Sequence, residues 1–375
     1  MLPDYAGGSL VNLMASLVEA CGGTPRHTVL RNFFASEARN VILLIVDGLG
    51  ERFLARHGAG GELARRRRAA ITSVFPSTTA SAITTSYTGR SPLEHGLTGW
   101  FTYFGEAGCV AAPLPFRSRG DNASLRQRGF SPERAFTLKS VFREIPIRSI
   151  VVTHKDIVDS DYNVRHCDGA ERLAYATLEE WIAQVEAAVK SSSERKFIYT
   201  YWPDYDATSH RYGCESPEAL RTLHDIDAAF GRLLARLSGT ESLVVATADH
   251  GFIDAEDCLE PPAAICSLLR FPFCGERRVV YCHVHDEKEF ILRARDWLKD
   301  TADVRPSREL VAEGWFGPGT PHPRFDERIG EVAILMRGRH TVKDWTTGEP
   351  RHLHIGNHGG TSDDEMLIPL ILETT

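Results

Sequence analysis

The apolar run at residues 243–248 leads directly into Asp249-His250-Gly251. A run of this kind is typical of a central strand in a parallel sheet, where both faces of the strand are buried. In open α/β sheets, ligand sites lie at the carboxyl ends of the strands. Aspartate and histidine side chains are also common metal ligands. Their position directly after a buried strand therefore indicates a ligand-binding site.

The same pattern recurs in three other places along the chain. Residues 40–46 form an apolar run that ends at Asp47-Gly48, and residues 197–202 lead into Asp206 and His210. His358 lies in a glycine-rich segment that precedes the apolar run at 366–372. Four clusters of aspartate or histidine beside apolar segments predict one polynuclear metal site assembled from distant parts of the chain.

Predicted strands alternate with predicted helices, which favours an α/β fold with a mostly parallel central sheet and helices on both of its faces. Strands are expected at 40–46, 70–75, 148–153, 196–202, 242–248, 278–284, 331–337 and 367–373. Helices are expected at 9–21, 51–57, 61–68, 79–88, 136–143, 168–191, 215–238, 287–299 and 307–313. We expect one catalytic domain over residues 1–375, with residues 253–348 forming a small α+β cap inserted within it.

Composition and charge exclude several classes of function. The formal net charge of −7 gives no electrostatic reason to expect a nucleic acid duplex as a partner. The sequence contains no stretch of 18 apolar residues, so no membrane span is predicted. The eight cysteines are dispersed and form no CxxC motif, which favours reduced thiols and a cytoplasmic location. We interpret the basic run at 65–68 as a solvated helix end. The oligomeric state stays open.

Each candidate ligand also has a purely structural interpretation. Asp206 and His210 are four residues apart, so a helical turn would place both on one face, where they could bind one ion. The alternative is a helix N-cap followed by a surface histidine. Asp47-Gly48 could form a turn at the end of a strand, Asp249-His250 could be a cap, and His358 could lie in a tight loop. The recurrence of these segments in such strand contexts favours the metal site.

Hydroxyl residues follow the expected strand that ends near Phe75. Ser77, Thr78 and Thr79 begin a predicted helix. A helix N-terminus offers unpaired N–H groups and a positive dipole end, both of which suit a phosphate. A hydroxyl held there beside a metal ion would ionise more easily than a free alcohol and could attack phosphorus. The alternative is that Ser77 or Thr78 serves only as the N-cap.

With these segments in place, the chain resembles the alkaline phosphatase superfamily, and within it the type I phosphodiesterase/nucleotide pyrophosphatase family. The resemblance covers nearly the whole chain and rests on residues 46–48, 75–79 with 88–96, 206–213, 247–251 and 358–360. It implies that Thr79 is the nucleophile and forms a phospho-threonine intermediate. It further implies two divalent metal ions, zinc by preference and manganese as the alternative. The implied ligand sets are Asp206, His210 and His358 for one ion, and Asp47, Asp249, His250 and Thr79 for the other.

The implied activity is that of a phosphodiesterase or nucleotide pyrophosphatase acting on a small-molecule phosphoester. A phosphomonoesterase, a phosphonate hydrolase and a non-catalytic phosphate-binding protein are the alternatives. The resemblance implies a phosphate-binding asparagine three residues after the nucleophile, where this chain has Ala82, and a glycine where it has Ser209. No arginine follows Thr79 before Arg90, and an arginine fork is the usual clamp for monoesters, so we expect a preference for diesters.

Four residues downstream of the nucleophile are candidates for a substrate pocket. Trp100, Phe101 and Tyr103 could stack on an aromatic group of a substrate, and Arg117 could bind an anion. Hydrophobic packing is the alternative for Trp100 and Phe101, and a solvated loop charge is the alternative for Arg117.

Overall fold

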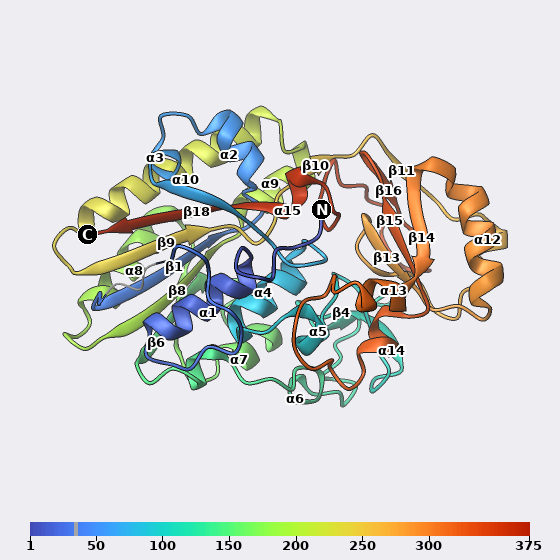
Figure 1. Cartoon of the computed structure of the whole chain (residues 1–375), viewed down its shortest axis with the longest axis horizontal. Coiled ribbons are helices and arrows are strands. Elements are labelled where there is room, and N and C mark those ends of the chain that lie inside the picture. Colours follow the sequence, from blue (N-terminus) through green and yellow to red (C-terminus); the bar gives the residue numbers. More distant parts are fainter. Residues whose placement is uncertain (34–36) are drawn as a thin grey trace.

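The computed structural model describes residues 1–33 and 37–375, and a seven-stranded sheet forms its centre (Figure 1). The strands are, in spatial order, β2 (Arg67–Thr72), β18 (Leu367–Thr374), β9 (Ser242–Thr247), β1 (Asn40–Val46), β8 (Lys196–Trp202), β6 (Arg148–His154) and β7 (Glu171–Tyr175). Only β18 runs antiparallel to its neighbours, and the remaining pairs are parallel. The predicted mostly parallel α/β fold is confirmed.

The register of the central strands brings their carboxyl ends together. Val46 of β1 lies opposite Trp202 of β8, and Ile45 lies opposite Thr247 of β9. Every residue of β1 and of β9 is buried, as the apolar runs predict. Because the three strands are parallel and in register, the segments that follow them leave the sheet at one edge.

Helices cover both faces of this sheet (Figure 1). On one side lie α2 (Glu51–His57), α3 (Glu62–Arg65), α9 (Asp204–Tyr212) and α10 (Pro217–Arg236). On the other side lie α1 (Leu10–Ala20), α4 (Thr79–Thr88) and α7 (Asp161–His166). The remaining helices of this part are α5 (Pro92–His95), α6 (Pro132–Ala135), α8 (Leu178–Lys190) and α15 (Asp363–Met366). The helix α1 is buried almost all round, because it packs beneath α4.

A second, antiparallel sheet lies within residues 253–348. Its strands are, in spatial order, β12 (Cys274–Gly275), β13 (Val279–Cys282), β15 (Val332–Met336) and β14 (Ala302–Pro306). They pack with α12 (Glu287–Leu298) around their own apolar cluster, which includes Phe290, Val304 and Ile334. Beside it lie α11 (Ala263–Cys266), α13 (Ser307–Ala312) and α14 (Phe325–Ile329). We call residues 253–348 the cap.

Short strands join the cap to the main part of the chain. β10 (Ile253–Asp254) of the cap pairs with β17 (Gly356–Asn357) outside it, and within the cap β11 (Asp257–Leu259) pairs with β16 (His340–Val342). β3 (Thr102–Phe104), β4 (Cys109–Ala112) and β5 (Arg117–Ser118) form a three-stranded sheet, and Phe101 bridges to Gly275 of the cap. The segment carrying Trp100 and Phe101 is thereby fixed against the cap.

Three predicted helices differ from the structure. The helix expected at 61–68 ends at Arg65, and Arg67 begins strand β2, where it forms an ion pair with Glu51. Only a short 3₁₀ turn (Val141–Arg143) occurs within 136–143, because the Ser140 hydroxyl is bonded to the Asp168 carbonyl and begins the turn there. The first third of the helix expected at 168–191 is the edge strand β7, and α8 begins after Thr177.

No helix within the described ranges is long and apolar enough to cross a membrane.

Candidate active site

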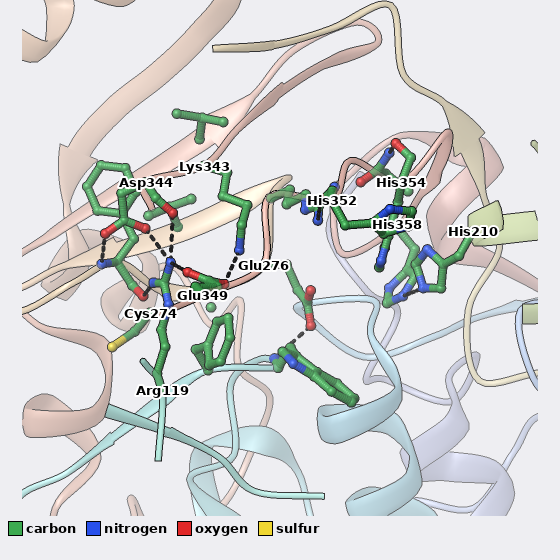
Figure 2. Close-up of a pocket in the computed structure, with 18 of the residues that line it drawn as sticks. Arg119, His210, Cys274, Glu276, Lys343, Asp344, Glu349, His352, His354 and His358 are labelled. Carbon is green, nitrogen blue, oxygen red and sulfur yellow. Dashed lines mark hydrogen bonds and ion pairs between the residues drawn. The ribbon is translucent and has the colours of Figure 1, made fainter. Parts of the chain in front are cut away.

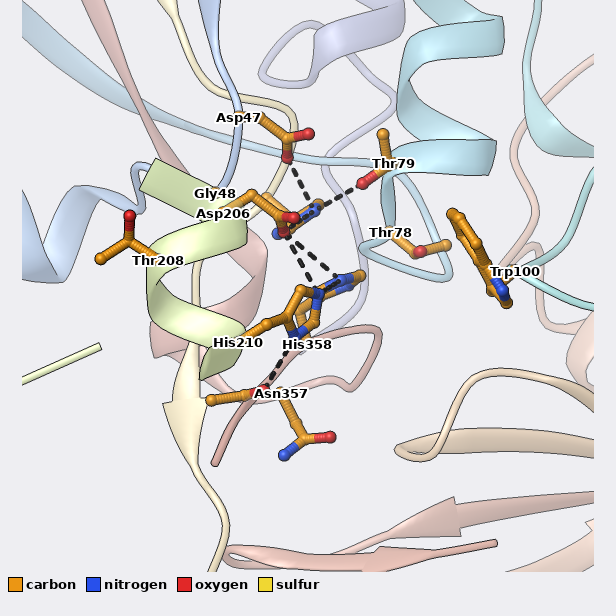
Figure 3. A network of polar contacts seen from close by, with 12 residues as sticks. Asp47, Gly48, Thr78, Thr79, Trp100, Asp206, Thr208, His210, Asn357 and His358 are labelled. Carbon is orange, nitrogen blue, oxygen red and sulfur yellow. Dashed lines mark hydrogen bonds and ion pairs between the residues drawn. The ribbon is translucent and has the colours of Figure 1, made fainter. Parts of the chain in front are cut away.

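The first group of candidate ligands lies where β1 and β9 end (Figure 3). Asp47 and Asp249 are buried, and His250 is fully buried. The His250 Nε2 atom lies 3.3 Å from Asp47 Oδ1 and 3.5 Å from Asp249 Oδ2. Asp249 Oδ1 accepts hydrogen bonds from the backbone N–H groups of Gly48 and His250, which fixes the carboxylate. Three side chains thus present ligand atoms to one point.

The second group comes from α9 and from the loop after β17. The His210 Nε2 atom lies 3.4 Å from Asp206 Oδ1 and 3.2 Å from His358 Nε2, and His358 Nε2 lies 3.7 Å from the same carboxylate oxygen. Asp206 and His210 share one face of α9, as their spacing predicts. The His210 Nδ1 atom is hydrogen-bonded to the Gly356 carbonyl, so Nε2 is the atom left for an ion.

The two groups adjoin each other. Asp206 Oδ1 lies 3.9 Å from His250 Nε2, and the rings of His250 and His358 are stacked with centroids 3.8 Å apart. All six predicted Asp and His ligands therefore surround one small region, which the sequence spreads over more than 300 residues. Ligand atoms of Asp47, Asp249 and His250 lie within 4.8 Å of one another, and so do those of Asp206, His250 and His358.

The chemistry of this region fits divalent cations. Asp47 Oδ1, Asp206 Oδ1 and Asp249 Oδ2 are buried and have no hydrogen-bond partner among the described residues. Burial raises the pKa of Asp47 to about 6, although the hydrogen bond from the Tyr201 hydroxyl lowers it. Burial and the charge of Asp47 raise the pKa of Asp249 to about 8. Three adjacent buried carboxylates without a cationic partner are costly unless a metal ion neutralises them.

Thr79 is the first residue of α4, and its side chain faces this region (Figure 3). The Thr79 Oγ1 atom lies 3.1 Å from His250 Nε2. The first intrahelical bond of α4 runs from the Ala82 N–H to the Thr78 carbonyl, so the N–H groups of residues 79–81 precede it and have no partner within the helix. The hydroxyl and these N–H groups together form a place where a phosphoryl oxygen can bind.

The pH dependence of stability tests whether these carboxylates need a cation. An unfolded aspartate titrates near pH 3.9, whereas folded Asp249 has a pKa of about 8. Between these values the folded state holds a proton that the unfolded state lacks, so the free energy of unfolding decreases as the pH rises. Buried histidines have the opposite effect below about pH 6.5. Burial lowers the pKa of His210 to about 4, so there the unfolded state binds a proton that the folded state lacks, and the free energy of unfolding increases as the pH rises.

We therefore expect metal-free protein to lose stability between about pH 6.5 and 8.5, by roughly 1.4 kcal/mol per pH unit for each proton released. Metal-loaded protein should show a much flatter profile, because the ion keeps the carboxylates ionised. Urea unfolding at several pH values measures both, and Asp249→Asn should remove much of the slope from the metal-free protein. If the free energy of unfolding of the metal-free protein varied as little with pH as that of the metal-loaded protein, the interpretation that these carboxylates need a cation would be wrong.

A cavity of about 420 Å³ extends from these ligands to the cap (Figure 2). The predicted site residues that line it are Thr79, Trp100, Phe101, Asp206, His210 and His358. The opposite wall comes from the cap and the segment after it, and includes Glu276, Arg277, Lys343, Asp344, Glu349, His352 and His354. Arg119 completes the lining on the side of β5.

Glu276 is the cap residue that reaches toward the start of α4. Its Oε1 atom accepts a hydrogen bond from the Thr78 hydroxyl at 2.6 Å and one from the Trp100 N–H at 2.7 Å. Burial raises the pKa of Glu276 to about 6, although these two hydrogen bonds lower it. Above neutral pH the cap therefore places a carboxylate beside the residue that precedes Thr79.

Three sequence expectations about substrate contacts need correction. Arg117 is exposed and its guanidinium binds the Asn122 carbonyl, so the cavity is lined by Arg119, two residues later, instead. Tyr103 is stacked on Phe271, with ring centroids 4.3 Å apart, and lies outside the cavity lining. Ala82 is fully buried in the apolar core, so a side chain at this position does not face the cavity.

The residues of the opposite cavity wall were not predicted. Glu276 and Arg277 precede a predicted strand in a run of charged residues, which is equally typical of a solvated turn. His352 and His354 lie just before His358, and three histidines within seven residues are the one signal that the sequence offered. The rings of His210 and His354 lie 4.2 Å apart.

Comparison with known proteins gives a family match over most of the chain. A profile described as type I phosphodiesterase/nucleotide pyrophosphatase matches residues 41–359. The chain is 38% identical over 78 residues to bis(5'-adenosyl)-triphosphatase ENPP4 of Bos taurus, and this match spans 17% of each protein.

Solved structures share the fold at low sequence identity. Murine ectonucleotide pyrophosphatase/phosphodiesterase 5 superposes with a TM-score of 0.65 at 15% identity, over 88% of this chain and 87% of that one. Phosphonoacetate hydrolase from Sinorhizobium meliloti 1021, solved with phosphonoformate, gives a TM-score of 0.63 at 19% identity, over 89% and 90% of the two chains.

Proposed function

The chain belongs to the type I phosphodiesterase/nucleotide pyrophosphatase family, a family of phosphoester hydrolases, and we propose that it hydrolyses small-molecule phosphodiesters or pyrophosphates on a two-metal site with Thr79 as the nucleophile. The observation that carries the proposal is the approach of the Thr79 hydroxyl, at the N-terminus of α4, to His250 within a group of six Asp and His ligands. An inactive threonine-to-alanine variant of the murine phosphodiesterase, solved with AMP, supports the role of a threonine.

Two ligand groups would hold the ions. Asp47, Asp249 and His250 would bind one, and Asp206, His210 and His358 the other. Divalent ions bound there lower the pKa of a hydroxyl and stabilise negative charge on phosphoryl oxygens. Nitrogen ligands make up half of the set, which favours zinc, with manganese as the alternative.

In the proposed reaction, the Thr79 hydroxyl gives its proton to solvent water and its oxygen attacks phosphorus in line. The bond between Thr79 Oγ1 and phosphorus forms, and the bond from phosphorus to the leaving oxygen breaks. Water then hydrolyses the phospho-threonine and restores the hydroxyl. The N–H groups at the start of α4 would donate hydrogen bonds to a phosphoryl oxygen throughout, the role that the resemblance gives to an asparagine side chain.

The direct test is a comparison of kcat/KM for bis-aryl phosphates, aryl monophosphates and nucleotide esters on protein loaded with zinc or manganese. We expect turnover of the diesters, with a larger kcat/KM than for the matched monoesters. A protein that binds phosphate esters without hydrolysing any of them would instead be the non-catalytic alternative. A larger kcat/KM for the monoester would favour the phosphomonoesterase alternative.

The buried carboxylate of Glu276 supports the preference for diesters. A monoester dianion brings one more negative charge to phosphorus than a diester does, and a carboxylate near Thr78 repels it. We expect Glu276→Gln to raise the ratio of monoester to diester kcat/KM by roughly tenfold at pH 8. Glutamine keeps an acceptor oxygen for Thr78 and Trp100, so the variant removes charge with little change in shape.

The matched control for this variant is Glu349→Gln, which also removes a carboxylate from the cavity wall but on the far side, where Glu349 is paired with Lys343. It should leave the ratio of monoester to diester kcat/KM nearly unchanged. If both variants shift the ratio equally, the net charge of the cavity sets the preference, and Glu276 has no special part.

A phosphonate hydrolase is the second candidate function. Phosphonoacetate hydrolase shares the fold over most of both chains, and the cap end of this cavity is lined by charged side chains that include Arg277 and Lys343. Release of acetate and phosphate from phosphonoacetate would identify this activity. The cytoplasmic location stays a prediction from the cysteines.

A further inference from the structure

Arg277 differs from the other cationic side chains that line the cavity. Arg119 forms ion pairs with Asp344 at 2.8 Å and with Glu349 at 3.1 Å, and Lys343 forms one with Glu349 at 2.5 Å (Figure 2). Among residues 1–33 and 37–375, no carboxylate lies within 4.0 Å of the Arg277 guanidinium. The Arg277 Nη2 atom donates a hydrogen bond to the His352 carbonyl at 3.0 Å.

The position of Arg277 places its charge at one end of the site. His352, whose carbonyl it contacts, has its ring 5.3 Å from that of His354, and His354 lies 4.2 Å from the ring of His210. Burial is the main cause that lowers the pKa of His210, and the charge of Arg277 adds to it. Glu276, the preceding residue, is bonded to Thr78 and Trp100 instead. The side chains of Glu276 and Arg277 thus lie at different ends of the cavity.

A half-buried guanidinium without a carboxylate partner is a binding site for an anion. Its donors form a planar fork that fits carboxylate or phosphate in two parallel hydrogen bonds. In the proposed reaction the nucleophile lies at the α4 end, so in-line geometry places the leaving group away from Thr79, on the side of Asp206, His210 and His358. Arg277 shares the cavity with all of these residues.

We propose that Arg277 binds a negatively charged group on the leaving portion of the substrate, so that the preferred substrates are phosphoesters or pyrophosphates whose leaving group carries a carboxylate or phosphate of its own. This inference rests on the proposed function. It is compatible with a preference for diesters, because the additional charge lies on the leaving group and not on the phosphoryl oxygens that face Glu276.

Matched substrate pairs test the proposal on the metal-loaded protein. The carboxylate arm compares methyl 4-carboxyphenyl phosphate with methyl 4-carbamoylphenyl phosphate, which differ only in the charge of the leaving phenol. The phosphate arm compares ATP with the 4-nitrophenyl ester of AMP, which share the adenylyl group but release pyrophosphate or nitrophenol. Each arm yields a ratio of kcat/KM for the charged over the neutral leaving group.

We expect Arg277→Met to reduce kcat/KM for the charged member of at least one pair by about ten- to hundredfold, and to change the neutral member by less than about threefold. The arm that responds identifies the anion as carboxylate or phosphate. Arg277→Lys keeps the charge without the fork and should give an intermediate loss. Arg293→Met, on the exposed face of α12, is the control and should change neither member.

Product inhibition gives a second readout that does not require turnover of the charged substrates. The products 4-hydroxybenzoate and pyrophosphate should inhibit hydrolysis of the neutral esters, and Arg277→Met should raise the inhibition constant of the one that matches the responding arm. An equal loss for charged and neutral substrates in both arms would overturn the proposal, since Arg277 would then act on the phosphoryl group or on the fold. Failure of wild-type protein to hydrolyse even the neutral esters would instead refute the proposed function.

Discussion

Thr79→Ala is expected to lower kcat for a bis-aryl phosphate by about a thousandfold or more. The variant lacks the oxygen that is proposed to attack phosphorus, and within residues 1–33 and 37–375 Thr79 is the residue whose hydroxyl is hydrogen-bonded to the His250 ring. The fold should persist, because Thr79 is only the first residue of α4 and the N-cap is Thr78. Steady-state kinetics, a thermal melt and elemental analysis of the same sample separate loss of chemistry from loss of structure or metal.

The neighbouring Thr78→Ala provides the matched control. Thr78 Oγ1 donates its hydrogen bond to Glu276, away from the ligand groups, so its loss should cost less than about tenfold in kcat. Thr79→Ser should retain measurable activity, because it restores an attacking hydroxyl. Acid quenching during turnover should trap a phosphorylated peptide that contains residue 79 in the wild type and not in Thr79→Ala. If Thr78→Ala is the inactive variant, the nucleophile lies one residue earlier than proposed.

The central part of the fold could be predicted because its signals are local. Strands β1 and β8 match the predicted ranges, since continuous apolar runs are compatible only with strands buried on both faces. The ligands follow from the same signal, because residues that come after parallel neighbouring strands must meet at one edge of the sheet. Strand β7 was missed since it lies at the edge, where exposed Glu171 and Arg172 give the run a helical character.

The substrate end of the site could not be predicted in the same way. Arg277 and Glu276 reach the cavity only because the cap folds back over the carboxyl edge of the main sheet, and no local pattern encodes that contact. Arg117 and Arg119 differ in role for a similar reason, since a shift of two residues along an irregular strand decides which one meets Asp344. Local patterns therefore predicted the residues of the two ligand groups and left the cap side of the cavity unassigned.

Removal of metal is expected to have the other large effect. Six Asp and His ligands in two adjoining groups should bind two transition-metal ions per chain, and chelation should reduce kcat by a thousandfold or more, with recovery on addition of zinc or manganese. The buried oxygens without hydrogen-bond partners on Asp47, Asp206 and Asp249 are the positions where we expect the ions to bind. Metal addition should also raise the melting temperature, because the ions bind only the folded state.

Asp206→Ala and Asp204→Ala form a matched pair for this prediction, since both residues lie in the first turn of α9 and only Asp206 contacts the histidine ligands. Asp206→Ala should lose one of the two ions by elemental analysis and most of the activity. Asp204→Ala should keep both ions and nearly all of the activity, because its side chain lines a separate surface hollow. Well under one transition-metal ion per wild-type chain after mild reconstitution would refute the two-metal site. Loss of metal from Asp204→Ala as well would mean that the start of α9, and not the Asp206 carboxylate, holds the ion in place.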